Sequence, residues 1–237
     1  MFAYNMAKHN MTRVSSDWYS HECMFSIDVL EVFIKNVEEQ IKVSIDNYKV
    51  KKEALNGKEY DYNEEWGVEI YAQINGLSFE IFDLDETFKE YFPNLQRKSS
   101  LITLFSYLEH TLDDLCLSFK KSENHLIDLK DINGKGIERS ATYLKKVCGI
   151  KNSKGTNEWT IINEIRIIRN LIVHNQGKFT VIEGKPKKSE IDIIKKTELL
   201  DGDIEVKIKE DYLLFVLNTF KAYFKLLDKE IKEFPKL

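Results

Sequence analysis

Residues 169–174 of this 237-residue chain read Arg-Asn-Leu-Ile-Val-His and lie near the end of a strongly apolar segment with helical periodicity. Arg169 carries a permanent positive charge, and His174 carries an imidazole that ordinarily titrates near neutral pH. In a helix the two lie about one and a half turns apart. Because an arginine can hold a phosphate while a histidine moves a proton, this pair could cleave RNA without a metal.

The rest of the segment adds polar groups to the side of the helix that carries His174. At about 100° per residue, a polar stripe forms on one side from Asn163, Arg166, Asn170 and His174. The opposite side carries an apolar stripe of Ile161, Ile165, Ile168 and Ile172. Glu164 is the only acid nearby in the sequence, so we expect an anion-binding surface, for which phosphate is the natural ligand.

The ends of this helix are also indicated by the sequence. Asn157 can cap its N-terminus, Glu158 suits the positive first turn, and Gly177 can adopt the left-handed conformation that ends a helix. A purely structural role remains an alternative for both motif residues. In that case Arg169 pairs with Glu109 or Asp113, and His174 caps the helix end.

The Arg169, Asn170 and His174 pattern resembles the signature of the HEPN superfamily, in which an Arg, followed directly by a polar residue, precedes a His by four to six residues. The resemblance covers about residues 95–234 and implies an all-α, HEPN-like helical bundle over 95–237. Residues 1–94 would form an N-terminal helical extension. Many HEPN proteins are metal-independent endoribonucleases in toxin–antitoxin, abortive-infection or CRISPR-associated defence.

The resemblance also implies roles for individual residues. His174 would act as general base or acid, Arg169 would stabilise the phosphate, and Asn170 would orient either one, while Arg166 and Asn163 would bind substrate. One helix supplies one His although the reaction needs an acid and a base, so a homodimer with a composite site is expected. An antitoxin or a defence-system protein is a further expected partner. Gln176 stands where members silenced by adenylylation carry a Tyr, which argues against that regulation.

Composition limits the other functions. Lys plus Arg number 35 against 39 Asp plus Glu, a net charge of −4, so any contact with RNA must be local. The lysine pairs and the basic segment 185–188 are typical of ordinary surface charge. The longest apolar run, 212–217, is too short to span a membrane. Three widely separated cysteines indicate reduced, buried thiols. Both observations favour a cytoplasmic protein. No metal or cofactor is expected, because no His or Cys partner at ligand spacing accompanies His9, His21, His110 and His125.

Periodicity predicts a mostly helical chain. Apolar residues at spacings of three, four or seven predict a helix from Leu30 to Tyr48, and residues 66–92 are assigned to helix after a polar break. Pro93 and Asn94 predict a stop before a long helix from Ser99. Further elements are expected at 137–147 (helix), 178–189 (basic loop), 197–200 with 204–208 (β-hairpin around 201–203) and 210–234 (helix).

Two functions other than a nuclease fit the same sequence. The chain could be a non-catalytic HEPN-like helical module that binds RNA, a nucleotide or a partner protein through the polar stripe. It could also be an assembly protein in which the amphipathic segment 23–55 docks a partner helix.

Overall fold

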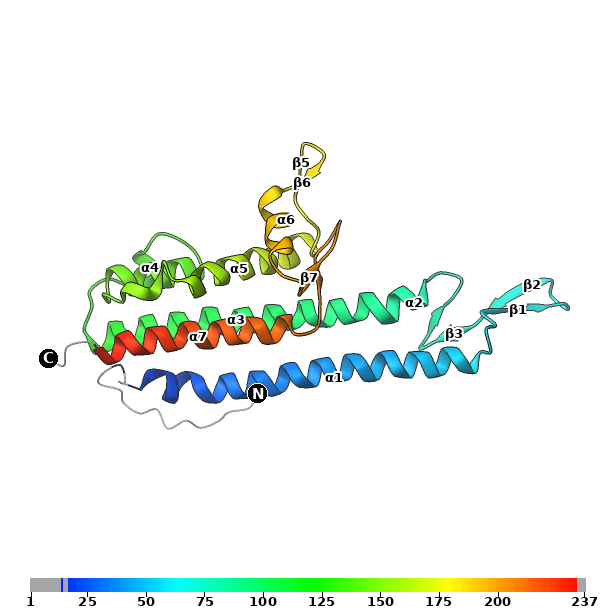
Figure 1. Ribbon diagram of the computed structural model, residues 1–237, viewed down its shortest axis with the longest axis horizontal. Coiled ribbons are helices and arrows are strands. Elements are labelled where there is room, and N and C mark those ends of the chain that lie inside the picture. Colours follow the sequence, from blue (N-terminus) through cyan, green and yellow to red (C-terminus); the bar gives the residue numbers. More distant parts are fainter. Residues whose placement is uncertain (1–13, 15–16, 234–237) are drawn as a thin grey trace.

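A computed structural model describes Val14 and residues 17–233, and expectations for the beginning of the chain, His9 and Phe234 lie outside these residues. Three long helices lie side by side along the long axis (Figure 1): α1 (Met24–Ala54), α3 (Phe92–Ser122) and α7 (Tyr212–Glu233). Helices α4 (Ile137–Lys146) and α5 (Asn157–Asn175) form a second layer against α3 and α7. The described chain is therefore mostly helical, as expected.

Helix α1 follows a strict heptad pattern on its buried side. Its four fully buried residues are Ile27, Ile34, Ile41 and Tyr48, each seven residues from the next. A seven-residue repeat keeps one seam of a long helix facing its neighbours, which here are α3 and α7. The predicted helix is thus confirmed and extends beyond both expected ends.

The main core lies where α1, α3, α5 and α7 meet. Helix α3 contributes Leu101, Leu104, Leu108 and Leu112, all with no exposed surface, and α7 contributes aromatic residues such as Phe220. The three cysteines, at positions 23, 116 and 148, are buried and free, as predicted. Burial raises the pKa of the Cys148 thiol to about 12, so this thiol stays protonated at neutral pH.

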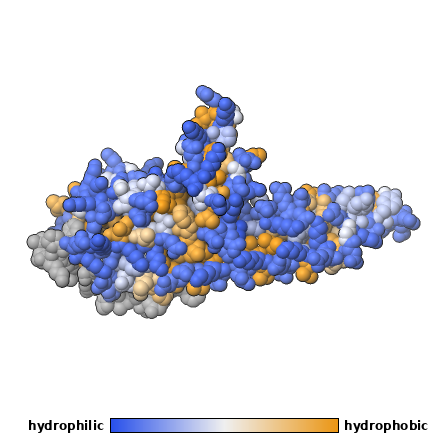
Figure 2. Space-filling model, viewed as in Figure 1, coloured by the Kyte–Doolittle hydropathy of each residue, from blue (hydrophilic) through white to orange (hydrophobic). Residues whose placement is uncertain are grey.

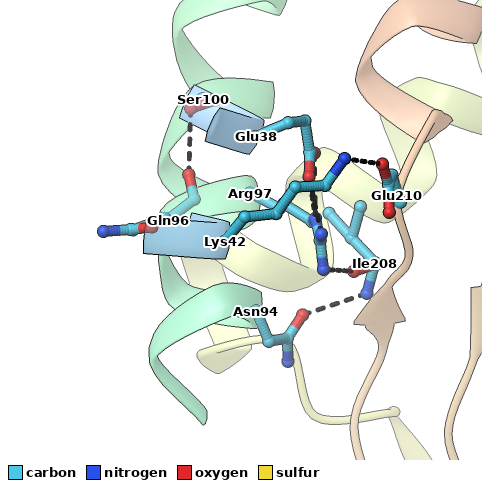
Figure 3. A network of polar contacts seen from close by, with 8 residues as sticks. All are labelled: Glu38, Lys42, Asn94, Gln96, Arg97, Ser100, Ile208 and Glu210. Atoms are coloured by element: carbon cyan, nitrogen blue, oxygen red, sulfur yellow. Dashed lines mark hydrogen bonds and ion pairs between the residues drawn. The ribbon is translucent and has the colours of Figure 1, made fainter. Parts of the chain in front are cut away.

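A polar network fixes the junction of α1, α3 and the segment before α7 (Figure 3). Arg97 of α3 donates to both carboxylate oxygens of Glu38 on α1, at 2.6 Å from Nη2 to Oε2 and 2.9 Å from Nε to Oε1. Arg97 also donates to the carbonyl oxygen of Ile208, whose own amide donates to Asn94 Oδ1 at 3.0 Å. Lys42 and Glu210 form an exposed ion pair beside them, 2.7 Å apart.

Short elements connect the long helices. Four antiparallel two-stranded sheets occur in the described chain: β1 (Tyr60–Asn63) with β2 (Val68–Tyr71), β3 (Gln73–Ile74) with β4 (Leu77–Ser78), β5 (Val181–Ile182) with β6 (Lys185–Pro186), and β7 (Leu200–Asp201) with β8 (Lys207–Ile208). The short helical segments are η1 (Tyr19–Cys23), α2 (Leu84–Glu86), η2 (Thr87–Tyr91), η3 (Leu129–Asp131), η4 (Lys151–Ser153) and α6 (Lys188–Lys195).

The helix assigned to residues 66–92 is wrong over most of its length. Residues 68–78 form strands β2, β3 and β4, and only α2 and η2 are helical before α3 begins. Asn75 and Gly76 both have positive φ, 54° and 83°, which is the geometry that Asn-Gly adopts in a tight hairpin turn. This dipeptide between apolar residues was the local signal for a hairpin.

Three further expectations need correction or refinement. Pro93 does not stop a helix: it lies at the start of α3, directly after the π-helix η2, and the helical run continues through it from Leu84 to Ser122. The expected basic loop 178–189 contains the β5–β6 hairpin, and the unpredicted helix α6 follows it. The hairpin before the last helix is confirmed as β7–β8, with shorter strands than expected.

The part of the chain that connects α1 to α3 forms one end of the molecule and has its own small core. Tyr48, Ile74, Leu84 and Phe88 form a second buried cluster, separate from the main core, and Tyr48 stacks on Phe88 with ring centroids 4.7 Å apart. We call the part of the chain from residue 48 to 92 the distal end. Position 94, the expected division between the two parts, lies inside α3.

Most of the face in Figure 2 is hydrophilic, with apolar residues gathered near the middle, beneath the projecting α6 segment. No helix within the described part of the chain combines the length and apolarity needed to cross a membrane.

Candidate functional site

The helix that carries the motif, α5, is held at both ends by local interactions. Its N-cap is Thr156, whose side chain accepts a hydrogen bond from the Trp159 amide at 3.1 Å, and the expected cap, Asn157, is the first helical residue. At the other end Gln176 and Gly177 both have positive φ, 57° and 87°. The Gly177 amide donates to the Leu171 carbonyl at 2.9 Å, which confirms the predicted termination.

The buried side of α5 differs slightly from the expected apolar stripe. The fully buried residues are Trp159, Ile162, Ile165, Ile168 and Leu171. Ile161 and Ile172, expected at the centre of the stripe, are half-buried at its edge. The polar stripe faces away from this core, with its four residues half-buried or exposed.

Arg169 contacts three groups. Its Nη2 lies 3.6 Å from Glu109 Oε2 on α3, and its Nη1 donates to Asn170 Oδ1 at 3.1 Å. The guanidinium carbon lies 5.6 Å from the centre of the Phe105 ring. The side chain is 21% exposed, and its buried Nε has no hydrogen-bond partner among the described residues. The guanidinium is thus fixed in place while part of its hydrogen-bonding capacity is unused.

Arg166 lies against a different carboxylate. Its Nη2 is 3.7 Å from Glu138 Oε1 on α4, and Glu138 also accepts from Lys154 at 2.7 Å. Glu164 is thus the only acid near the motif in the sequence, but other acids lie near it in the structure. Glu109 and Glu138 come from α3 and α4, elements distant in the sequence, whereas Glu164 pairs with Lys196. Each arginine of α5 is partly neutralised, so the surface is less positive than expected.

The two asparagines act mainly on α5 itself. Asn163 Nδ2 donates to the Trp159 carbonyl at 2.9 Å, which leaves its buried Oδ1 without a partner in the described chain. Asn170 orients Arg169 through the hydrogen bond given above. Asn170 is therefore a positioning residue in this structure, and Asn163 faces its own helix backbone.

His174 is the most accessible member of the motif. It is exposed, and no hydrogen bond or ion pair joins its imidazole to any other described residue. The expected alternative, in which His174 caps the helix, does not describe this geometry, because backbone amides satisfy the final turn. The structural alternative for Arg169 is partly realised, since Glu109 is its partner, whereas Asp113 pairs with Arg139.

Lys98 is a residue near the site that the sequence analysis missed. It is 7% exposed, and a Cβ added at Gly177 would lie 2.6 Å from its Nζ, so the ammonium is packed against the end of α5. The sequence signal for this buried lysine was its position within the apolar pattern of α3, three residues before Leu101.

Taken together, α5 presents a fixed guanidinium and a free imidazole, groups that can hold an anion and transfer a proton. No protein-family model, no curated protein and no solved structure matches this chain.

Proposed function

We propose that this chain is a metal-independent endoribonuclease of the HEPN type, with Arg169, Asn170 and His174 as its catalytic group and with Arg166 and Asn163 as substrate-binding residues. Helices α3, α4, α5 and α7 would be the four-helix core of that fold. The observation that carries the proposal is the combination on α5 of an arginine held by Asn170 and a histidine whose imidazole makes no hydrogen bond or ion pair with another described residue. In the cell we place it in the cytoplasm, as a toxin or phage-defence effector with an antitoxin or defence-system partner.

The reaction needs only groups that the chain provides. His174 accepts the proton of the ribose 2′-OH, and the 2′-oxygen attacks the adjacent phosphorus. The bond from phosphorus to the 5′-oxygen breaks, and that oxygen takes a proton from a second imidazole. Arg169 donates to the non-bridging oxygens as negative charge develops, and the product ends in a 2′,3′-cyclic phosphate.

The second imidazole comes from a second copy of the chain. Val173, next to His174 in the sequence, is 44% exposed, and Ile167, which lies seven residues before His174 and on its side of α5, is half-buried. Apolar side chains next to a polar site are typical of a surface that pairs with its own copy across a twofold axis. Such a dimer brings two His174 side chains to one RNA backbone.

The test compares cleavage of a labelled RNA by the wild-type chain and by His174→Ala. We expect His174→Ala to abolish cleavage with unchanged melting temperature, because the exposed imidazole makes no hydrogen bond or ion pair with the residues that the structure describes. His110→Ala is the matched control, since His110 is also exposed and lies on α3. Cleavage should persist in EDTA, and a 2′-deoxy substrate should resist. RNA cutting that survives His174→Ala would refute the proposal.

A non-catalytic module that binds RNA, a nucleotide or a partner protein is the second candidate. It is favoured by the carboxylate neighbours of both arginines, which lower the positive charge available to a transition state. Stable RNA binding without strand scission, at any protein concentration or time, would support it over the nuclease.

A further inference from the structure

A cavity lies between the beginning of α3 and the end of α5, next to the motif. Its volume is about 530 Å³. Apolar walls come from Leu95, Ile102 and Ile172, and Tyr91 lies at the edge with 57% of its surface exposed. A cavity of this size with a few polar groups is typical of a small-molecule or nucleotide site.

The floor of the cavity holds a buried ammonium group. Lys98 lines the cavity, its side chain is 9% exposed, and its Nζ lies 3.3 Å from Glu205 Oε2. No hydrogen bond of Lys98 to another described residue accompanies this ion pair. An ammonium has three donors, and one ion pair with Glu205 leaves donors of Lys98 for a ligand. Lys98 is therefore placed to donate to an anion in the cavity.

The other polar groups define the charge of the ligand. Lys178 lies at the cavity edge and Glu205 faces Lys98, so the lining carries two cations and one anion. The Asn94 amide is already used, since it donates to Val206 and accepts from Ile208. Gln176 contributes an exposed amide from the end of α5. A phosphate near Lys98 and Lys178, joined to a ring that stacks on Tyr91, matches this lining.

The cavity continues the row of residues that contains Arg169. Ile172 lies three residues after Arg169 on α5, and Ile102 lies three residues before Phe105 on α3. Because Arg169 lies over Phe105, one helical turn separates its guanidinium from the cavity wall. A nucleic-acid strand whose phosphate contacts Arg169 would place a neighbouring nucleotide at the cavity.

We propose that this cavity binds one nucleotide of the RNA strand next to the scissile phosphate, with Lys98 and Lys178 holding its phosphate and Tyr91 stacking on its base. The inference rests on the proposed nuclease function and names a binding site that the motif does not include.

The test measures binding separately from cleavage. The probe is a fluorescein-labelled, fully 2′-O-methylated RNA pentamer, which lacks the attacking hydroxyl. Its dissociation constant is measured over a range of salt concentrations. Lys178→Ala should weaken binding and reduce the slope of log K against log salt by about 0.7, the value per phosphate contact for single strands. Lys188→Ala, an exposed lysine at the start of α6, is the matched control and should change neither quantity.

Two more variants test Lys98 at the floor of the cavity and Tyr91 at its edge. The double variant Lys98→Met/Glu205→Gln removes the ion pair without leaving one charge buried, and it should weaken binding about tenfold. Tyr91→Ala should also weaken binding about tenfold through lost stacking. Tyr62→Ala, at the distal end with 58% exposure, is its control. Thermal melting shows that each variant is folded.

The outcomes separate the two proposals. In one outcome, the wild type cleaves ordinary RNA while all three cavity variants keep the pentamer affinity and the salt slope of the wild type. This result would overturn the cavity proposal and leave the nuclease proposal intact. If these variants bind the pentamer more weakly than the wild type does, but the wild type never cleaves RNA, the result would support the cavity proposal and overturn the nuclease proposal. A wild type that does not bind the pentamer overturns the cavity proposal.

Discussion

Arg169 is shared between a carboxylate of its own fold and the phosphate that we propose it binds. Its side chain is 21% exposed and lies 3.6 Å from Glu109, which is itself partly exposed. An ion pair of this kind contributes at most about 1 kcal/mol, less than a charge-assisted contact with a phosphate. Glu109 therefore helps to hold Arg169 in position, and under the proposed function it would compete with RNA for the guanidinium.

Glu109→Gln tests this competition. The amide keeps the shape of the side chain and removes its charge, so we expect RNA affinity and the cleavage rate to rise about threefold, equivalent to roughly 0.6 kcal/mol. Glu31→Gln on α1 removes a carboxylate from an exposed pair and should have no effect. An unchanged or lower cleavage rate in Glu109→Gln would show that Glu109 is not a competitor of the substrate.

At this scale the sequence identified the motif but not its neighbours. Arg169, Asn170 and His174 lie within six residues, so the helical period alone sets their relative directions. Glu109 and Glu138 reach the motif from α3 and α4, and Lys98 reaches it from the beginning of α3. Helix packing decides which residues these are, and no local pattern encodes it.

At the scale of elements, the attachment of α1 to α3 depends on a buried ion pair. Arg97 and Glu38 are each 13% exposed, and both oxygens of Glu38 are engaged (Figure 3). Lys42 and Glu210 join the same elements at the surface, where they are 56% and 51% exposed. The two ion pairs differ in burial. Removing one partner of the buried pair should therefore lower the free energy of unfolding more than removing one partner of the exposed pair.

Arg97→Ala should lower the free energy of unfolding by about 3 kcal/mol, because Glu38 is left as a buried, unpaired charge and Ile208 loses a donor. Lys42→Ala is the control from the same network, and it should leave the free energy of unfolding nearly unchanged because its ion pair is exposed to solvent. Urea unfolding curves of the two variants measure both values. Equal, small losses would mean that the buried pair does not hold the two helices together.

The elements that periodicity predicted well are the long ones. In α1, α5 and α7 many apolar positions repeat, so the helical signal is strong even where ends shift by a few residues. The strands of the distal end contain two to four residues and pair only with one neighbour, so the Asn75-Gly76 turn and not an alternating pattern marks them. Helix α6 was missed because its eight residues follow a Lys- and Pro-containing segment that reads as loop.

The distal end should be sensitive to acid. Hydrogen bonds from Lys52 and Lys89 lower the pKa of Asp85 from 3.8 to about 2. A carboxyl with a lowered pKa in the folded state contributes stability above the unfolded value of 3.8, and this contribution disappears as the pH falls towards 2. Tyr48 belongs to the small core of the distal end. We therefore expect its fluorescence or NMR signal to report local opening of the distal end between pH 3.8 and about 2. In Asp85→Asn this transition should be absent, and a transition that remains would assign it to another carboxyl.

At the scale of the whole molecule, the described residues form two apolar clusters, which α1 and the beginning of α3 connect. Ile27 and Ile34 of α1 belong to the main core, whereas Tyr48 belongs to the small core of the distal end. The sequence analysis divided the chain at residue 94, but both α1 and α3 extend through the two regions. The motif helix packs mainly on α3 and α7. Residues 57–86 of the distal end can therefore open without disturbing Arg169 and His174, whereas Tyr91 lines the proposed cavity.

Hydrogen exchange should therefore show two levels of protection. A small cluster buries too little apolar surface to match the main core, so amides of residues 57–86 should exchange by local opening, faster than those of α3 and α7. Tyr48→Ala should speed exchange in that segment and leave exchange in α5 unchanged. Phe220→Ala in the main core should lower the free energy of unfolding by about 3–5 kcal/mol and speed exchange throughout the described chain. If Tyr48→Ala instead raised exchange equally in α5 and α7, the two clusters would unfold as one unit. The distal end would then be part of what supports Arg169 and His174.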